Sequence, residues 1–156
     1  MRAVLQRASS GRVKVDGEVV GELVPGRPGY VVLLGAGKDD READALALAD
    51  KIVGLRLFED ADGRMNFGLE EVGGSLLVVS QFTLYADCKK GRRPSFVDAL
   101  EPGAAQALIE RFVARCRERG AQVATGRFQA HMEVELVNDG PVTILLDSKT
   151  LGAAKA

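Results

Sequence analysis

The sequence predicts a single α+β domain in which a mostly antiparallel β-sheet or barrel packs against two α-helices. Short apolar or alternating runs bounded by Gly, Pro, Asn and Asp recur along the chain, whereas only two segments repeat apolar residues at helical spacing. The chain has 156 residues, the size of one domain, and 46% of them are apolar, which is enough for one sizeable core.

The first 36 residues are expected to form three strands. The run at 2–8, RAVLQRA, predicts the first. The alternating runs at 12–24 around Asp16-Gly17 predict a hairpin, because Asp and Gly accept the positive φ of a tight turn. The continuous apolar run at 30–36, YVVLLGA, is typical of a strand buried on both faces.

The first helix is expected to begin near Asp39, which with Glu42 three residues later forms a possible capping box. Its apolar stripe repeats at i, i+3, i+4 and i+7 through Ala45, Leu48, Ala49 and Ile52. The second helix is expected to have Pro102 in its first turn and Gly120 at its end. Its stripe is Leu108, Ile109, Phe112 and Cys116.

Further strands are expected between and after these helices. Residues 55–65 predict a strand entering an acidic turn at 60–63, and 75–85 predict a second buried strand. The region 122–146 is strand-rich, and Asn138-Asp139-Gly140 predicts a hairpin turn within it. Pro141 then stands where the returning strand should begin, although proline has no N–H for the ladder. The Gly140-Pro141 pair therefore either only turns the chain or contacts a ligand, since glycine permits close approach and an X-Pro bond can be cis.

Composition excludes several function classes. The net charge is −1, so contact with nucleic acid requires a local basic patch. Cys88 and Cys116 are interpreted as reduced thiols, and the only histidine, His131, as a half-buried strand residue. We expect no metal and no cofactor, because neither metal-ligand spacing nor a phosphate-binding glycine loop is present. Without a long apolar run, the protein is expected to be cytoplasmic.

Two polar stretches remain as candidate sites. The predicted strand at 75–85 includes Ser80, Gln81 and Thr83, whose side chains either line a cleft or are satisfied by nearby backbone. The run KKGRRPSF at 89–96 has four cations in five positions. It is either a solvated loop or a patch that contacts phosphates.

In order and in flanking sequence, these segments resemble the D-aminoacyl-tRNA deacylases, also called D-tyrosyl-tRNA deacylases. The family motifs Ser-Gln-Phe-Thr and Asn-x-Gly-Pro-x-Thr occur intact at 80–83 and 138–143. The resemblance covers residues 1–147, predicted to be the deacylase domain, whereas the tail 148–156 has no family counterpart. Gln129 stands where the family often has glycine, and Cys88 where threonine is common.

The resemblance implies a homodimer in which Gly140 and Pro141 of one protomer, joined by a cis bond, lie beside the Ser80–Thr83 segment of the other. It implies hydrolysis of the ester between a D-amino acid and the tRNA's terminal adenosine, as chirality proofreading without metal or cofactor. L-aminoacyl-tRNA would be rejected. Glycyl-tRNA, including glycine mischarged on the alanine tRNA, would be excluded poorly because glycine has no side chain to clash.

Residue roles follow from the same resemblance. The implied catalytic residues are Gln81, Phe82 and Thr83. The implied substrate-binding residues are Arg7, Ser80, Phe128, Met132, Asn138, Gly140, Pro141 and Thr143. The implied tRNA contacts are Lys89, Lys90, Arg92 and Arg93.

The chemistry of the reaction has alternatives. Threonine is a weak nucleophile without an adjacent base, so we favour activation of water by the substrate ribose 2′-OH over attack by Thr83. Two rival functions stay open. One is a non-catalytic dimer that binds RNA 3′ ends, and the other is a threonine-nucleophile esterase or amidase acting on small D-amino acid derivatives.

Overall fold

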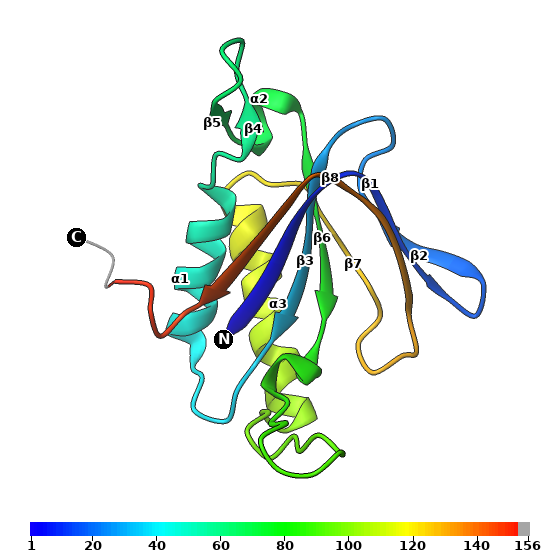
Figure 1. Ribbon diagram of the computed structural model, residues 1–156, viewed down its shortest axis with the longest axis vertical. Helices are drawn as coiled ribbons and strands as arrows, with labels where there is room; N and C mark the ends of the chain where they lie inside the picture. Colours follow the sequence, from blue (N-terminus) through cyan, green and yellow to red (C-terminus); the bar gives the residue numbers. More distant parts are fainter. Residues whose placement is uncertain (153–156) are drawn as a thin grey trace.

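A computed structural model describes residues 1–152 and confirms an α+β fold in which two long helices cover one face of a six-stranded sheet (Figure 1). The helices are α1 (Glu42–Val53) and α3 (Pro102–Glu118), and they lie side by side. The strands of the sheet are β1 (Arg2–Val15), β2 (Glu18–Glu22), β3 (Gly29–Gly35), β6 (Ser75–Ser80), β7 (Val123–Thr125) and β8 (Glu133–Asp147).

The sheet is mostly antiparallel, as predicted, but it also contains two parallel pairs. Its order is β2-β1-β3-β6-β7, and β8 pairs with β1. All three partners of β1 are antiparallel to it, as predicted, but β3 pairs with β6 and β6 with β7 in parallel. The parallel pairs arise because the connections that precede β6 and β7 contain α1 and α3, and such crossovers return the chain to the same end of the sheet.

The central strands β3 and β6 are buried on both faces. The continuous apolar run at 30–36 predicted this for β3. Tyr30, Val32 and Leu34 belong to the core under the helices. Val31 instead belongs to a second core, which lies against residues of β1, β2 and β8 where the sheet curls. The sheet therefore has two apolar layers, one beneath the helices and one inside the curl.

The second helix matches its prediction. Pro102 occupies its first turn, and Gly120, with φ +89°, follows its last residues. The predicted capping box of the first helix is wrong. That helix begins at Glu42, and the Asp44 carboxylate accepts the N–H of Arg41 at 2.9 Å, so the cap lies two residues later than Asp39 and Glu42 suggested.

Several short elements replace longer predicted strands. The expected strand at 55–65 is reduced to β4 (Phe58–Glu59), which pairs with β5 (Met65–Phe67). The acidic turn between them is present, because the Asp60 carboxylate accepts the N–H groups of residues 62 and 64. A short helix α2 (Leu69–Val72) follows. The expected strand at 75–85 ends at Ser80, after which residues 82–85 form a 3₁₀ helix, η1 (Phe82–Tyr85).

The hairpin predicted at Asn138-Asp139-Gly140 is wrong. Residues 133–147 form one strand, β8, which pairs with β1 along its whole length. Asn138 pairs with Ala8 and Thr143 with Gln6, so residues 139–142 bulge out opposite the single residue Arg7. A local turn signal produced a bulge here because the 14-residue β1 offers partners to both halves of β8.

Residues that follow β8 pack against the body of the protein. The Ser148 hydroxyl donates to Asp44 at 2.7 Å, and the Lys149 ammonium lies 3.0 Å from the same carboxylate. The proposed boundary between domain and tail at 147/148 stays a prediction, and residues 153–156 of that tail lie outside the described residues. Within residues 1–152, no helix is both long and apolar enough to cross a membrane.

Candidate active site

A cleft of about 710 Å³ opens where β3 and β6 end, and it brings together two stretches that the sequence singled out separately. Ser80, Gln81 and Phe82 line it from the end of β6 and the start of η1. Phe128 and Met132 line it from the segment that precedes β8. Further walls come from Leu34, Gly35, Ala36, Val79, Phe96, Ala99, Leu100, Glu101, Pro102, Ile109, Gln129, Ala130, His131 and Val134.

Two glycines allow η1 to approach the end of β3 closely. A Cβ on Gly35 would lie 2.7 Å from the carbonyl oxygen of Gln81. A Cβ on Gly37 would lie 2.4 Å from the ring of Tyr85. Neither position has room for a side chain, so these glycines set where the Ser80–Thr83 segment lies.

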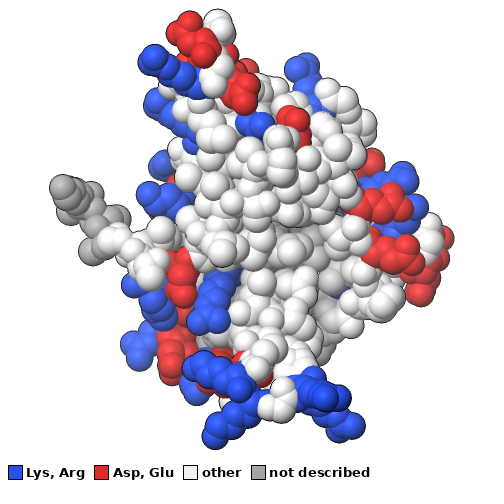
Figure 2. Space-filling view, viewed as in Figure 1, with Lys and Arg blue, Asp and Glu red and all other residues white. Residues whose placement is uncertain are grey.

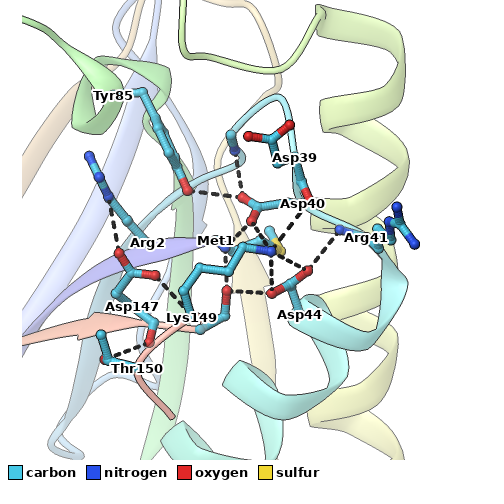
Figure 3. Close-up of polar contacts among 12 residues, drawn as sticks. Met1, Arg2, Asp39, Asp40, Arg41, Asp44, Tyr85, Asp147, Lys149 and Thr150 are labelled. Atoms are coloured by element: carbon cyan, nitrogen blue, oxygen red, sulfur yellow. Dashed lines mark hydrogen bonds and ion pairs between the residues drawn. The ribbon is translucent and has the colours of Figure 1, made fainter.

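A polar network holds the other end of η1 (Figure 3). The Tyr85 hydroxyl donates to Asp40 at 2.9 Å, and the Gly37 N–H donates to the same carboxylate at 2.6 Å. Arg2 donates to the Leu84 carbonyl at 3.2 Å, and its guanidinium lies 4.5 Å from the centre of the Tyr85 ring. The network therefore fixes the C-terminal end of η1, whose first residues Phe82 and Thr83 belong to the Ser80–Thr83 segment.

Burial and hydrogen bonds in this network set the protonation states of Asp40 and Tyr85. Burial alone would raise the pKa of Asp40, but hydrogen bonds from the Met1 ammonium, the Gly37 N–H and the Tyr85 hydroxyl lower it below its usual range. Burial raises the pKa of Tyr85, and its bond to the Asp40 carboxylate raises it further. Tyr85 therefore remains a hydrogen-bond donor at neutral pH, and Asp40 remains ionised.

The start of η1 presents free backbone donors beside the cleft. Among the described residues, the N–H groups of Phe82 and Thr83 have no acceptor, as is usual for the first residues of a helix. The Thr83 side chain is exposed and does not line the cleft. Its hydroxyl accepts from the Gln81 amide, which is a donor and not a base. The geometry thus offers a place for a developing negative charge but no activated threonine.

The basic run lies next to the cleft, on an exposed loop. Asp87 and Ser95 pair across the base of this loop, and Lys89, Lys90, Arg92 and Arg93 are all exposed on it. Figure 2 shows Lys and Arg side chains gathered at the lower end of the molecule, where Figure 1 places the loop that follows η1. Phe96, directly after the loop, packs edge-on against Phe82 with 5.0 Å between ring centres. The basic loop is therefore joined to the cleft by an aromatic contact.

The bulge in β8 is held by residues that the resemblance singled out. The Asn138 carboxamide accepts the N–H of Val142 at 3.0 Å and donates to the Thr143 hydroxyl at 3.3 Å. The Gly140-Pro141 bond is cis, and both residues are exposed.

Arg7 anchors the bulge from inside the protein. It is only 6% exposed, and it donates to the carbonyl of Asp139 at 3.0 Å and to that of Leu57 at 2.7 Å. The hydrogen bond between Asn138 and Thr143 thus joins the two ends of the bulge. Arg7 connects the bulge to the segment before β4.

Within one chain, the bulge and the cleft are separate. Asn138 pairs with Ala8, whereas Ser80 pairs with Leu34, which pairs with Ala3. On β1 these two pairing points are five positions apart, roughly 17 Å along an extended strand, and Val134, which lines the cleft from β8 itself, is four positions from Asn138. Gly140 and Pro141 do not line the cleft of their own chain.

Sequence reasoning missed several lining residues. Phe96 is the last residue of the run at 89–96 and Ile109 belongs to the second helix's predicted core stripe, and neither was predicted to line a site. The interpretation of His131 as a half-buried strand residue is wrong, because it is exposed, precedes β8 and lines the cleft. No local pattern distinguishes these residues from ordinary surface or core positions. Their common location follows from the way β6, α3 and the segment before β8 meet.

Comparison with known proteins identifies the family to which the chain is similar. A family model described as D-Tyr-tRNA(Tyr) deacylase matches residues 4–147. The chain is 59% identical over 149 residues to a D-aminoacyl-tRNA deacylase of Symbiobacterium thermophilum, covering 96% of this chain and 97% of that one. It is 56% identical over 151 residues to a D-aminoacyl-tRNA deacylase of Thermotoga petrophila, covering 97% and 99%.

Two solved structures share the fold. One is the c-Myc DNA Unwinding Element Binding Protein, with a TM-score of 0.85 and 36% identity, covering 94% of this chain and 98% of that one. The other is described as a probable eukaryotic D-amino acid tRNA deacylase, with a TM-score of 0.75 and 19% identity, covering 93% and 97%. The family-model match and the high identity to curated relatives together lead to one conclusion: this chain belongs to the D-Tyr-tRNA(Tyr) deacylase family.

Proposed function

We propose that this protein hydrolyses the ester bond of D-aminoacyl-tRNA, releasing the D-amino acid and intact tRNA, and spares L-aminoacyl-tRNA. The observation that carries the proposal is the cleft beside the start of η1. It combines free backbone donors at Phe82 and Thr83 with apolar and aromatic walls that include Phe128. Curated relatives named as D-aminoacyl-tRNA deacylases, up to 59% identical, support the same activity.

The reaction requires little from side chains. An aminoacyl ester is already activated, so hydrolysis needs a positioned water and stabilisation of the oxyanion that forms. The N–H groups of Phe82 and Thr83 would bind that oxyanion, while Ser80, Gln81 and Phe82 hold the terminal adenosine. The ribose 2′-OH of the substrate would assist the water. This route accounts for the lack of a base in contact with Thr83 in the described part of the chain.

We propose a homodimer in which Gly140 and Pro141 of one protomer lie beside the cleft of the other. The separation of bulge and cleft within one chain supports this arrangement, because a protomer does not bring its own bulge to its own cleft. Val137 and Leu145 of β8 are 56% and 76% exposed, and the face over β1 and β8 carries little charge in Figure 2. Exposed apolar side chains on an uncharged face are typical of a protein interface.

Selectivity in this proposal comes from backbone atoms. An enzyme that removes D-residues from many tRNAs must recognise the α-carbon, because every side chain also occurs on correct product. Carbonyl groups of Gly140 and Pro141 would engage the α-amino group and occupy the space into which an L side chain would point, so L substrates are excluded by steric clash. Glycyl-tRNA would escape this exclusion, including glycine mischarged on the alanine tRNA.

Contacts to the rest of the tRNA are assigned to the basic loop. Lys89, Lys90, Arg92 and Arg93 would neutralise phosphates of the acceptor stem, which predicts that affinity falls with rising salt. We place this activity in the cytoplasm, where aminoacyl-tRNA is used.

One assay separates the proposal from its rivals. Chelator-treated protein is incubated with D-tyrosyl-tRNA, L-tyrosyl-tRNA, free D-tyrosine esters, and D-tyrosyl-tRNA that lacks the terminal 2′-OH. We expect turnover of D-tyrosyl-tRNA alone, unaffected by the chelator, and a loss of about 100-fold or more without the 2′-OH. Binding without turnover would favour the RNA-binding dimer. Turnover of the free esters would favour the threonine esterase. Sedimentation of the same sample tests the dimer.

A further inference from the structure

Gln129 has a backbone conformation that its side chain does not favour. Its φ is +62°, and the N–H of Ala130 donates to the carbonyl of Arg127 at 3.2 Å, so Gln129 is the third residue of a turn of type II pattern. Glycine and asparagine suit that position, whereas glutamine does not. In residues 1–152 the only other non-glycine residue with positive φ is Asp16, in the β1–β2 hairpin turn. Unfavourable conformations of this kind concentrate at ligand sites.

The turn places two consecutive residues on the cleft. Phe128 and Gln129 both line it, with Phe128 half-buried and Gln129 exposed. The other side-chain amide on the cleft is engaged, because the Gln81 amide donates to the Thr83 hydroxyl. Within the part of the chain that the structure describes, the Gln129 amide makes no hydrogen bond. It is thus a free donor and acceptor beside an aromatic ring.

An aromatic ring next to a free carboxamide is suited to an unpaired nucleobase. The ring packs against the face of the base, and the amide bonds its edge. A glutamine carbonyl accepts from the adenine 6-amino group while its NH₂ donates to N7, a pairing that guanine or hypoxanthine cannot complete because their 6-position is a carbonyl. The base beside the ester in the proposed substrate is adenine.

We infer that Gln129 is a specificity-determining residue that recognises the edge of the tRNA's terminal adenine, with Phe128 against the face of that base. This inference rests on the proposed deacylase function and adds to it a side chain that distinguishes adenine from other bases by its edge. On this inference the unfavourable backbone conformation is retained because it places Gln129 on the wall of the cleft. Replacing Gln129 with glycine should therefore relieve the backbone and weaken recognition at the same time.

The test compares D-tyrosyl-tRNA ending in adenosine with the same tRNA ending in inosine, which has a carbonyl in place of the 6-amino group. For the native protein we expect kcat/KM to be about tenfold higher with adenosine, chiefly through KM. In Gln129→Gly this ratio should fall to about one, while the urea midpoint stays equal or rises. Asp16→Gly is the matched control, because it makes the same backbone change far from the cleft. It should keep the native ratio.

The outcomes are distinguishable from failure of the proposed function. If the native protein does not hydrolyse D-tyrosyl-tRNA ending in adenosine, the deacylase proposal and this inference both fall. If it does, and Gln129→Gly keeps the native preference for adenosine, only the inference is overturned. A lower urea midpoint for Gln129→Gly would also overturn it, since glutamine would then be serving stability at that position.

Discussion

Replacing Arg7 with methionine should destabilise the protein and reduce its selectivity together. Arg7 is almost fully buried and donates to two carbonyls, that of Asp139 in the bulge and that of Leu57 before β4. Methionine has similar length but no donor, so both carbonyls lose their partner. Each hydrogen bond from a charged donor is worth about 1.5–3 kcal/mol, and part of this is offset because a buried cation no longer has to be desolvated.

The net loss in the free energy of unfolding should be about 2–4 kcal/mol. With a denaturant slope of about 2 kcal/mol per molar urea, the urea midpoint should fall by roughly 1–2 M. Because the bulge loses its anchor, the preference for D- over L-tyrosyl-tRNA should fall by at least about tenfold, which corresponds to ~1.4 kcal/mol. Arg7→Lys keeps the positive charge but lacks the planar guanidinium that can donate to two carbonyls at once. Its urea midpoint and its D-over-L preference should therefore lie between those of the native protein and of Arg7→Met.

Arg12→Met is the matched control. Arg12 lies on the same strand and also pairs with β8, through Glu135, but its side chain is 47% exposed. Loss of such an exposed ion pair should change stability little, because water screens the two charges. If Arg7→Met and Arg12→Met show the same urea midpoint and the same D-over-L preference, Arg7 is not the anchor of the bulge.

Three further predictions concern the reaction, the bulge and pH. Thr83→Ala should keep its rate within about fivefold in single-turnover deacylation, because no base contacts Thr83; loss of nearly all activity would instead favour a covalent route. Gly140→Ala should lower the urea midpoint by an amount equivalent to about 1–3 kcal/mol, since φ is +130° and the new Cβ would lie 2.8 Å from Val142; an unchanged midpoint would contradict the bulge geometry. Burial raises the pKa of Tyr30 from 10.0 to about 12, so between these values the unfolded chain ionises while the folded chain does not. Stability should fall as pH rises above 10.0, and the ultraviolet signal of the phenolate should appear late for Tyr30 and Tyr85, the only two tyrosines; titration near 10.0 would show that they are not buried.

Turn signals in the sequence predicted the structure correctly where neighbouring residues alone decide the conformation. Asp16-Gly17 predicted a hairpin, and both residues have positive φ between β1 and β2. Asn138-Asp139-Gly140 carries an equally strong turn signal but forms a bulge. The difference lies outside the segment, in a first strand long enough to pair with both halves of β8. The residues of the turn segment itself carry no information about the length of β1.

The candidate site was predictable in part for the same reason. Ser80 and Gln81 stand out as polar residues after an apolar run, and the resemblance drew attention to Phe128 and Met132. Gln129 stood out only as a departure from the glycine that is common in the family, and His131 gave no comparable signal, because an exposed imidazole is ordinary until the fold places it beside a cleft. The positive φ of Gln129 depends on a hydrogen-bonded turn that only coordinates reveal.

Pairing of β8 on both sides of its bulge has a consequence for the timing of catalysis. A hairpin tip can open by releasing a few terminal contacts. The segment 139–142 differs, because β8 is paired with β1 on both sides of it and Arg7 donates a hydrogen bond to its Asp139 carbonyl. Swinging it aside would require breaking part of the longest strand pair in the protein. In the proposed dimer, substrate and product would therefore pass a stationary element, and turnover should not include a slow opening step of this segment.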